Sequence, residues 1–98
     1  MIQSFRNQGT EDIFNGENTK EARNTCPESL WRIVSRKLDL LDSAETLSDL
    51  RIPPGNRLEQ LTGGRKGQYS IRINDQYRIC FIWTHNGPDQ VEIVDYHS

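Results

Sequence analysis

The chain has 98 residues, of which 34% are hydrophobic and 27% charged, with a formal net charge of −2 at pH 7. This length predicts one domain over residues 1–98, and two Trp, three Tyr and three Phe argue against a disordered chain. Because no run approaches the roughly 20 apolar residues of a membrane helix, and residues 1–7 lack the apolar segment of a signal peptide, we expect a cytoplasmic protein with no membrane partner.

The sequence pattern of the first quarter of the chain predicts only short stretches of regular structure. Residues 2–5 alternate between apolar and polar side chains, which favours a short edge strand. Residues 10–14 predict one or two helical turns ended by Gly16. The span 17–24 is polar and has no apolar period, so we expect a mobile loop there.

A longer helix is expected next, ending near Asp42. Thr25 and Glu28 have the spacing of a capping box, and Pro27 falls in the first turn, where a missing N–H costs little. We expect Trp31 to belong to the core rather than to stack on a ligand. Apolar residues recur on one helical face at Leu30, Val34, Leu38 and Leu41.

Beyond a short helical turn near residues 46–50 and the breaker Pro53-Pro54-Gly55, the apolar period changes to two. A short strand is expected first and is broken by Gly63 and Gly64; three consecutive strands follow, joined by short turns at Asn74-Asp75 and Asn86-Gly87-Pro88, which predicts an antiparallel meander. The predicted fold class is α+β, with N-terminal helices packed on a twisted, mainly antiparallel β-sheet. The expected strands cover residues 57–61, 69–73, 77–83 and 91–96.

The alternation assigns side chains to the two faces of this sheet. The face expected to carry Arg72, Arg78 and Tyr96 lies opposite the helix. The face expected to pack on the helix carries Ile71, Ile73, Ile79, Phe81 and Ile93.

Positive charge is concentrated in one part of the chain. The first fifty residues carry a net charge of −3, whereas residues 57–78 carry a net charge of +3. A local cationic stripe on an acidic protein indicates one anionic ligand bound at one place. A solvated strand face with ion-paired arginines is the alternative at this point.

The candidate site residues lie around this stripe. Arginine presents a planar fork of donors that suits a phosphate, and histidine exchanges a proton near neutral pH. His97 is expected at the end of the last strand, beside Tyr96, although a terminal histidine is also common in a disordered tail. His85 lies in a predicted turn, where we expect it to be solvated. The candidate catalytic residues are Arg78, Tyr96, His97 and Arg65, and the candidate RNA- or phosphate-binding residues are Arg57, Lys66 and Arg72.

These groups suit transesterification of RNA, in which a ribose 2′-hydroxyl attacks the adjacent phosphate while cations stabilise the growing charge. Tyr96 could instead stack on an RNA base. Cys26 and Cys80 lack metal-ligand spacing and are expected to be unpaired reduced thiols. We therefore expect a site without metal or cofactor.

Four stretches of the sequence closely resemble one family: residues 1–5 (MIQSF), 53–59 (PPGNRLE), 67–78 (GQYSIRINDQYR) and 91–97 (VEIVDYH). The family is HigB (killer protein), within the RelE/ParE toxin superfamily. The resemblance implies a RelE-like fold and ribosome-dependent cleavage of messenger RNA. It also implies a helix-turn-helix antitoxin of the HigA type. The toxin would contact operator DNA only in complex with this antitoxin.

The resemblance carries over to particular residues. Arg78 matches the family's arginine after the aromatic residue of the third strand, and Tyr96 and His97 match an Asp-Tyr-His ending. Some members have a lysine where this chain has Thr62, so Arg65 or Lys66 is expected to supply that charge. Two alternatives remain: a ParE-like inhibitor of DNA gyrase that is not an enzyme, and an RNA-binding protein that blocks the ribosome without cutting.

Overall fold

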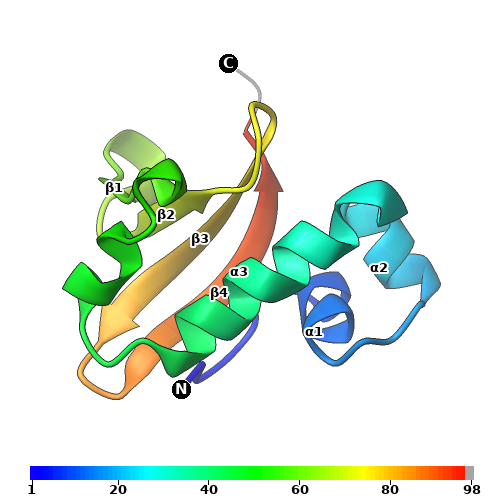
Figure 1. Cartoon of the computed structure of the whole chain (residues 1–98), viewed down its shortest axis with the longest axis horizontal. Helices are drawn as coiled ribbons and strands as arrows, with labels where there is room; N and C mark the ends of the chain where they lie inside the picture. Colours follow the sequence, from blue (N-terminus) through cyan, green and yellow to red (C-terminus); the bar gives the residue numbers. More distant parts are fainter. Residues whose placement is uncertain (97–98) are drawn as a thin grey trace.

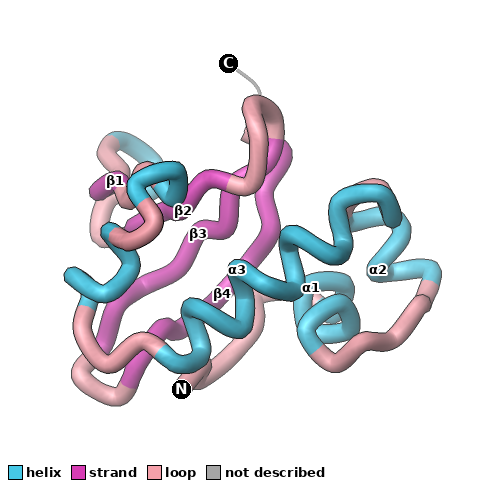
Figure 2. Tube along the Cα trace, in the orientation of Figure 1, coloured by secondary structure: helices cyan, strands magenta, loops and turns pink. Residues whose placement is uncertain are grey.

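The computed structural model describes residues 1–96 as a helical layer packed against a four-stranded antiparallel sheet. Figure 1 and Figure 2 show α3 lying across one face of the sheet, with α1 and α2 grouped near its N-terminal end. Within these residues no helix has the length and apolarity to cross a membrane. The helices are α1 (Gln8–Phe14), α2 (Lys20–Thr25) and α3 (Trp31–Ser43), and the strands are β1 (Glu59–Gln60), β2 (Tyr69–Arg72), β3 (Tyr77–Thr84) and β4 (Gly87–Asp95).

Strands β2, β3 and β4 form the predicted antiparallel meander, and β1 pairs with β2 at its edge, which gives the strand order β1-β2-β3-β4. Ser70 pairs with Glu59 on one side and Cys80 on the other, and Cys80 in turn pairs with Glu92. These four residues therefore form one row across the sheet. Short 3₁₀ helices connect the elements: η1 (Glu28–Leu30), η2 (Leu47–Arg51), η3 (Pro54–Asn56) and η4 (Gly63–Arg65).

The N-terminal segment lies beside β4 but forms less strand than expected. Phe5 makes an isolated parallel bridge with Val91, and the Gln3 N–H donates to the Pro88 carbonyl at 2.7 Å. This places Arg6 next to the sheet, because its own N–H donates to the Val91 carbonyl at 2.9 Å.

The predicted mobile loop over residues 17–24 is wrong, because α2 occupies its second half. Thr19 caps this helix by accepting from the Ala22 N–H at 3.1 Å, and Ala22 is fully buried. A Cβ at Gly9 would overlap the Thr25 hydroxyl and the Glu21 carbonyl oxygen. Close packing of α2 on a glycine of α1, rather than an apolar period, thus stabilises the helix.

The predicted capping box at Thr25 and Glu28 is also wrong. Thr25 is the last residue of α2, and its hydroxyl donates to the Glu21 carbonyl at 2.8 Å. Cys26 is extended, so α3 begins only at Trp31, after η1.

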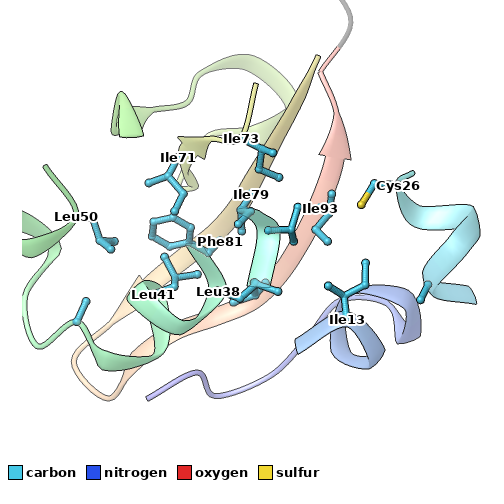
Figure 3. Packing of buried hydrophobic residues seen from close by; sticks show 14 residues of the cluster. Ile13, Cys26, Leu38, Leu41, Leu50, Ile71, Ile73, Ile79, Phe81 and Ile93 are labelled. Carbon is cyan, nitrogen blue, oxygen red and sulfur yellow. The ribbon is translucent and has the colours of Figure 1, made fainter. Parts of the chain in front are cut away.

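The core lies between α3 and the sheet, as the two periodicities predict. Figure 3 shows Phe81 of β3 facing Leu38 and Leu41 of α3. Trp31 packs against this cluster, and its indole N–H donates to the Cys26 carbonyl at 3.0 Å, which confirms its predicted core role. All five isoleucine and phenylalanine residues expected on the helix-facing side of the sheet are buried: Ile71, Ile73, Ile79, Phe81 and Ile93.

Both cysteines are free, as predicted; the structure also buries them, and we expect them to be unreactive in the folded protein. Burial raises the pKa of the Cys26 thiol from 9.0 to about 11, and burial also raises the pKa of the Cys80 thiol. At pH 8 we expect iodoacetamide to alkylate the native protein at least about a hundredfold more slowly than the protein unfolded in guanidinium. Mass spectrometry checks this, and fast native alkylation at either thiol would contradict the packing.

The raised pKa of the Cys26 thiol also makes the free energy of unfolding depend on pH. The folded state keeps the Cys26 proton between pH 9 and about 11, where the unfolded state loses it. The free energy of unfolding therefore falls as the pH rises through this window.

Candidate functional site

The sheet face turned away from α3 carries the candidate site. Ile71, Ile79 and Ile93 point toward α3, so the alternate residues of the same strands point to the opposite face, which we call the outer face. Ser70 and Cys80 form its floor and are both fully buried. Arg78 and Glu92 lie next to them on this face.

Arg78 is held on the outer face by contacts from several segments. Its Nε donates to the Ser70 hydroxyl at 2.8 Å and its Nη2 to the Arg57 carbonyl at 2.8 Å. Nη2 also lies 3.7 Å from a carboxylate oxygen of Glu59. The guanidinium carbon lies 5.7 Å from the centroid of the Tyr96 ring, a cation–π contact. The guanidinium is therefore fixed in orientation before any ligand binds.

Arg65 reaches the same face from η4. Its Nη1 donates to the Glu92 carboxylate at 2.8 Å and to the Gln68 amide oxygen at 3.1 Å. The hydrogen bond that Arg65 donates to the Glu92 carboxylate raises the pKa of Arg65, and Tyr96 contributes electrostatically to this shift. Arg65 and Arg78 both act electrostatically on Cys80, which lies beneath them. Two guanidinium groups thus lie around one buried floor.

Of the candidate catalytic residues, Arg65, Arg78 and Tyr96 all lie at the outer face. Tyr96 is 40% exposed, so its ring is accessible to a ligand. His97 lies outside the described residues. His85 is exposed in the turn between β3 and β4.

The three candidate phosphate-binding residues lie around this cluster. Arg57 is exposed, has a left-handed backbone (φ 45°) and supplies the carbonyl that holds Arg78. Arg72 stands opposite Arg78 in the β2–β3 register and forms an ion pair with Asp75 in the turn. That pairing offsets the repulsion expected between two cations on adjacent strands. Lys66 is exposed directly after η4.

Sequence reasoning did not single out the carboxylates of the outer face. Glu92 is largely buried against Arg65, with a side-chain exposure of 15%, whereas the Glu59 side chain beside Arg78 is 54% exposed. The signal that could have found them is the register, because Glu59 and Glu92 belong to the row through Ser70 and Cys80. In the free protein Arg65, Arg72 and Arg78 all have carboxylate neighbours, so the ion pairing weighed as an alternative is present.

The outer face has the chemistry of an anion site. Arg78 and Arg65 both lie beside a floor of uncharged buried groups, and an exposed phenol and an exposed carboxylate border Arg78. Residues 1–96 contain no group of three or more His, Cys, Asp or Glu side chains arranged to hold a metal ion.

Comparisons with known proteins agree with this fold and place the chain in a family. Residues 3–97 match the family described as the RelE-like toxin of type II toxin–antitoxin system HigB. The chain is 46% identical over 83 residues to Toxin HigB-1 of Vibrio cholerae, covering 85% of this chain and 84% of that protein. It is 36% identical over 78 residues to an uncharacterized protein of Haemophilus influenzae, covering 80% and 76% of the two chains.

A solved structure supports the fold independently. A chain of the YoeB-YefM complex from Staphylococcus aureus aligns with a TM-score of 0.61 at 19% identity, covering all of this chain and 97% of that one. At this identity the likeness bears on the fold, which is the predicted RelE-like α+β arrangement. From the family match and the identity to the Vibrio cholerae toxin, the chain belongs to the HigB family of RelE-like toxins of type II toxin–antitoxin systems.

Proposed function

We propose that this toxin is a ribosome-dependent endoribonuclease that cleaves messenger RNA and thereby inhibits translation and growth. The observation that carries the proposal is the convergence of Arg65, Arg78 and Tyr96 on the outer face. Such a toxin acts in the cytoplasm, where ribosomes translate. Messenger and ribosome are its partners.

The proposed chemistry is a transesterification carried out by side chains. A base removes the proton of the ribose 2′-hydroxyl, the 2′-oxygen attacks the adjacent phosphorus, and the bond to the leaving 5′-oxygen breaks as that oxygen takes up a proton. Arg78 and Arg65 stabilise the negative charge that grows on the non-bridging phosphate oxygens. Their fixed orientation, set by Ser70 and Glu92, reduces the reorganisation needed in the transition state.

We assign the base to Glu59, because it lies beside Arg78 and is more exposed than Glu92, the carboxylate paired with Arg65. Glu92 instead holds Arg65 in place. Tyr96 stacks on a base next to the cleaved bond, and His97, its neighbour in sequence, is assigned the proton donor for the leaving oxygen.

Glu59→Gln is therefore expected to lower the rate of cleavage by about a hundredfold, the usual loss when a general base is removed. Folding should be unaffected, since the side chain is half exposed. Single-turnover cleavage on programmed ribosomes measures the rate, and Glu45→Gln, at an exposed site after α3, is the matched control. Equal rates for the two variants would remove Glu59 from the mechanism.

The cleavage assay on programmed ribosomes also distinguishes the proposed nuclease from a ribosome-blocking RNA-binding protein and from a gyrase inhibitor. Site-specific breaks that require the ribosome support the nuclease, and intact messenger on stalled ribosomes would indicate a blocking RNA-binding protein. Intact messenger together with inhibited DNA supercoiling would indicate a ParE-like gyrase inhibitor.

Membership in a toxin–antitoxin family implies a cognate antitoxin. We propose that it is a helix-turn-helix protein of the HigA type, and that the toxin reaches operator DNA only in complex with it. Co-expression with the adjacent small open reading frame, followed by co-purification and operator binding, tests this assignment.

A further inference from the structure

A shallow pocket of about 450 Å³ opens beside the arginine cluster. Its lining comes from the N-terminal segment, the η4 region and β4: Arg6, Gly64, Arg65, Gln68 and Glu92. The volume falls within the roughly 300–1,000 Å³ typical of ligand pockets. Because Arg65 and Glu92 line the pocket and also belong to the candidate site, the two are continuous.

The charges of the lining favour an anion. The Glu92 carboxylate is paired with Arg65 and balances its charge. The Arg6 guanidinium therefore gives the lining of the pocket a net positive charge. The Arg6 backbone is fixed on β4 by the hydrogen bond from its N–H to the Val91 carbonyl, while its side chain is exposed. The position of this cation is thus set by the sheet, although residue 6 lies far from the other site residues in the sequence.

Gly64 lies in the wall of the pocket and adds no side chain there. Gly63 and Gly67 have positive φ values of 65° and 93°, which favour glycine, whereas the backbone of Gly64 does not require it. A Cβ at Gly64 would meet no atom within 4 Å, so packing does not require glycine either. The missing side chain leaves the wall of the pocket open to a group from outside.

We propose that this pocket is a subsite for a nucleotide flanking the scissile phosphodiester, with Arg6 binding its phosphate. The inference rests on the proposed nuclease function and extends it along the RNA strand. Gly64 lets the ribose or base approach the backbone, and Gln68 offers its amide to the nucleotide.

The test combines protein variants with modified messengers. Arg6→Gln is expected to lower kcat/KM for cleavage on programmed ribosomes about tenfold, the usual loss for one charge-assisted hydrogen bond. Arg6→Lys should recover part of it, and Arg32→Gln, an exposed arginine of α3 that lies outside the site, should match the wild type. Thermal unfolding of all variants should be unchanged, because these side chains are exposed.

Neutral methylphosphonates identify the phosphate that Arg6 contacts. One methylphosphonate is placed at each phosphate flanking the scissile bond in turn. At one position it should slow the wild-type toxin about tenfold but leave Arg6→Gln unaffected, because the interaction is already lost. If Arg6→Gln cleaves unmodified messenger as fast as the wild type does, the subsite is refuted. It is also refuted if a methylphosphonate slows the wild type and Arg6→Gln equally at every phosphate tested.

The role of Gly64 in the pocket wall is tested by comparing a leucine substitution there with the same substitution at another glycine. Gly64→Leu should raise KM, whereas Gly55→Leu, at a glycine that likewise has open space around it, should not. Equal KM values for the two variants would overturn the role of Gly64. A wild-type toxin that leaves messenger intact would refute the nuclease proposal itself, an outcome distinct from failure of the Arg6 subsite.

Discussion

Replacing Arg78 with alanine is expected to slow cleavage of ribosome-bound messenger by about a hundred- to a thousandfold, the usual effect of losing a donor aimed at transition-state charge. The Arg78 guanidinium lies near both Glu59 and Tyr96 and is oriented by Ser70 and the Arg57 carbonyl. Arg78→Lys should restore only part of the rate, because an ammonium cannot reproduce the planar fork. Single-turnover cleavage on programmed ribosomes measures both variants.

A folding defect must be separated from this loss. Alanine at position 78 leaves the buried Ser70 hydroxyl and the Arg57 carbonyl without their donor, at a cost of about 1–3 kcal/mol. Ser70→Ala removes the same hydrogen bond but keeps the charge, so it should lose stability while cleaving within about tenfold of the wild type. If Arg78→Ala cleaves as fast as Ser70→Ala, the outer face is not where the phosphate binds.

Phe81→Ala is expected to be the most damaging substitution for stability, at about 3–5 kcal/mol. Phe81 is fully buried between the sheet and α3, and its ring stacks on Tyr69 at a centroid distance of 6.2 Å. For a domain of this size such a loss lowers Tm by roughly 15–30 °C. Thermal or guanidinium unfolding measures it.

Two further variants show whether the loss comes from packing. Phe81→Leu keeps most of the apolar volume and should cost less, and Ile52→Ala, at a residue that is 73% exposed, should stay within about 0.5 kcal/mol of the wild type. A Phe81→Ala protein as stable as Ile52→Ala would contradict the core.

The sheet could be predicted because its strands alternate cleanly. Ile71, Ile79 and Phe81 repeat with period two, and one face of every central strand packs on α3, so the pattern determines both the strands and the buried side. The same alternation placed Arg72 and Arg78 on the opposite face, where the structure has them adjacent across the strands.

The α2 helix and the start of α3 depend on contacts that no local pattern carries. The six residues of α2 bury one alanine, and the helix packs closely on Gly9 of α1. Thr25 and Glu28 have the spacing of a cap, but the extended backbone of Cys26 separates them into two different helices. Tertiary packing here decides between local alternatives of similar energy.

The site was predicted only in part, for a related reason. Strand parity gives the face of Arg78 but not the direction of its guanidinium, which depends on Ser70, Glu59 and the turn at Arg57. Arg6 was missed because its place beside the pocket comes from the parallel bridge between Phe5 and Val91, a pairing between distant parts of the sequence.

The most direct measurement is the structure of the toxin on a ribosome whose messenger carries a 2′-O-methyl group at the cleavage position, which blocks the attack but preserves the phosphate. We expect the scissile phosphate within hydrogen-bonding distance of the Arg78 guanidinium, with Arg65 on the same phosphate and Tyr96 against a neighbouring base. A messenger bound across the helical layer, with the outer face open to solvent, would contradict the proposed site.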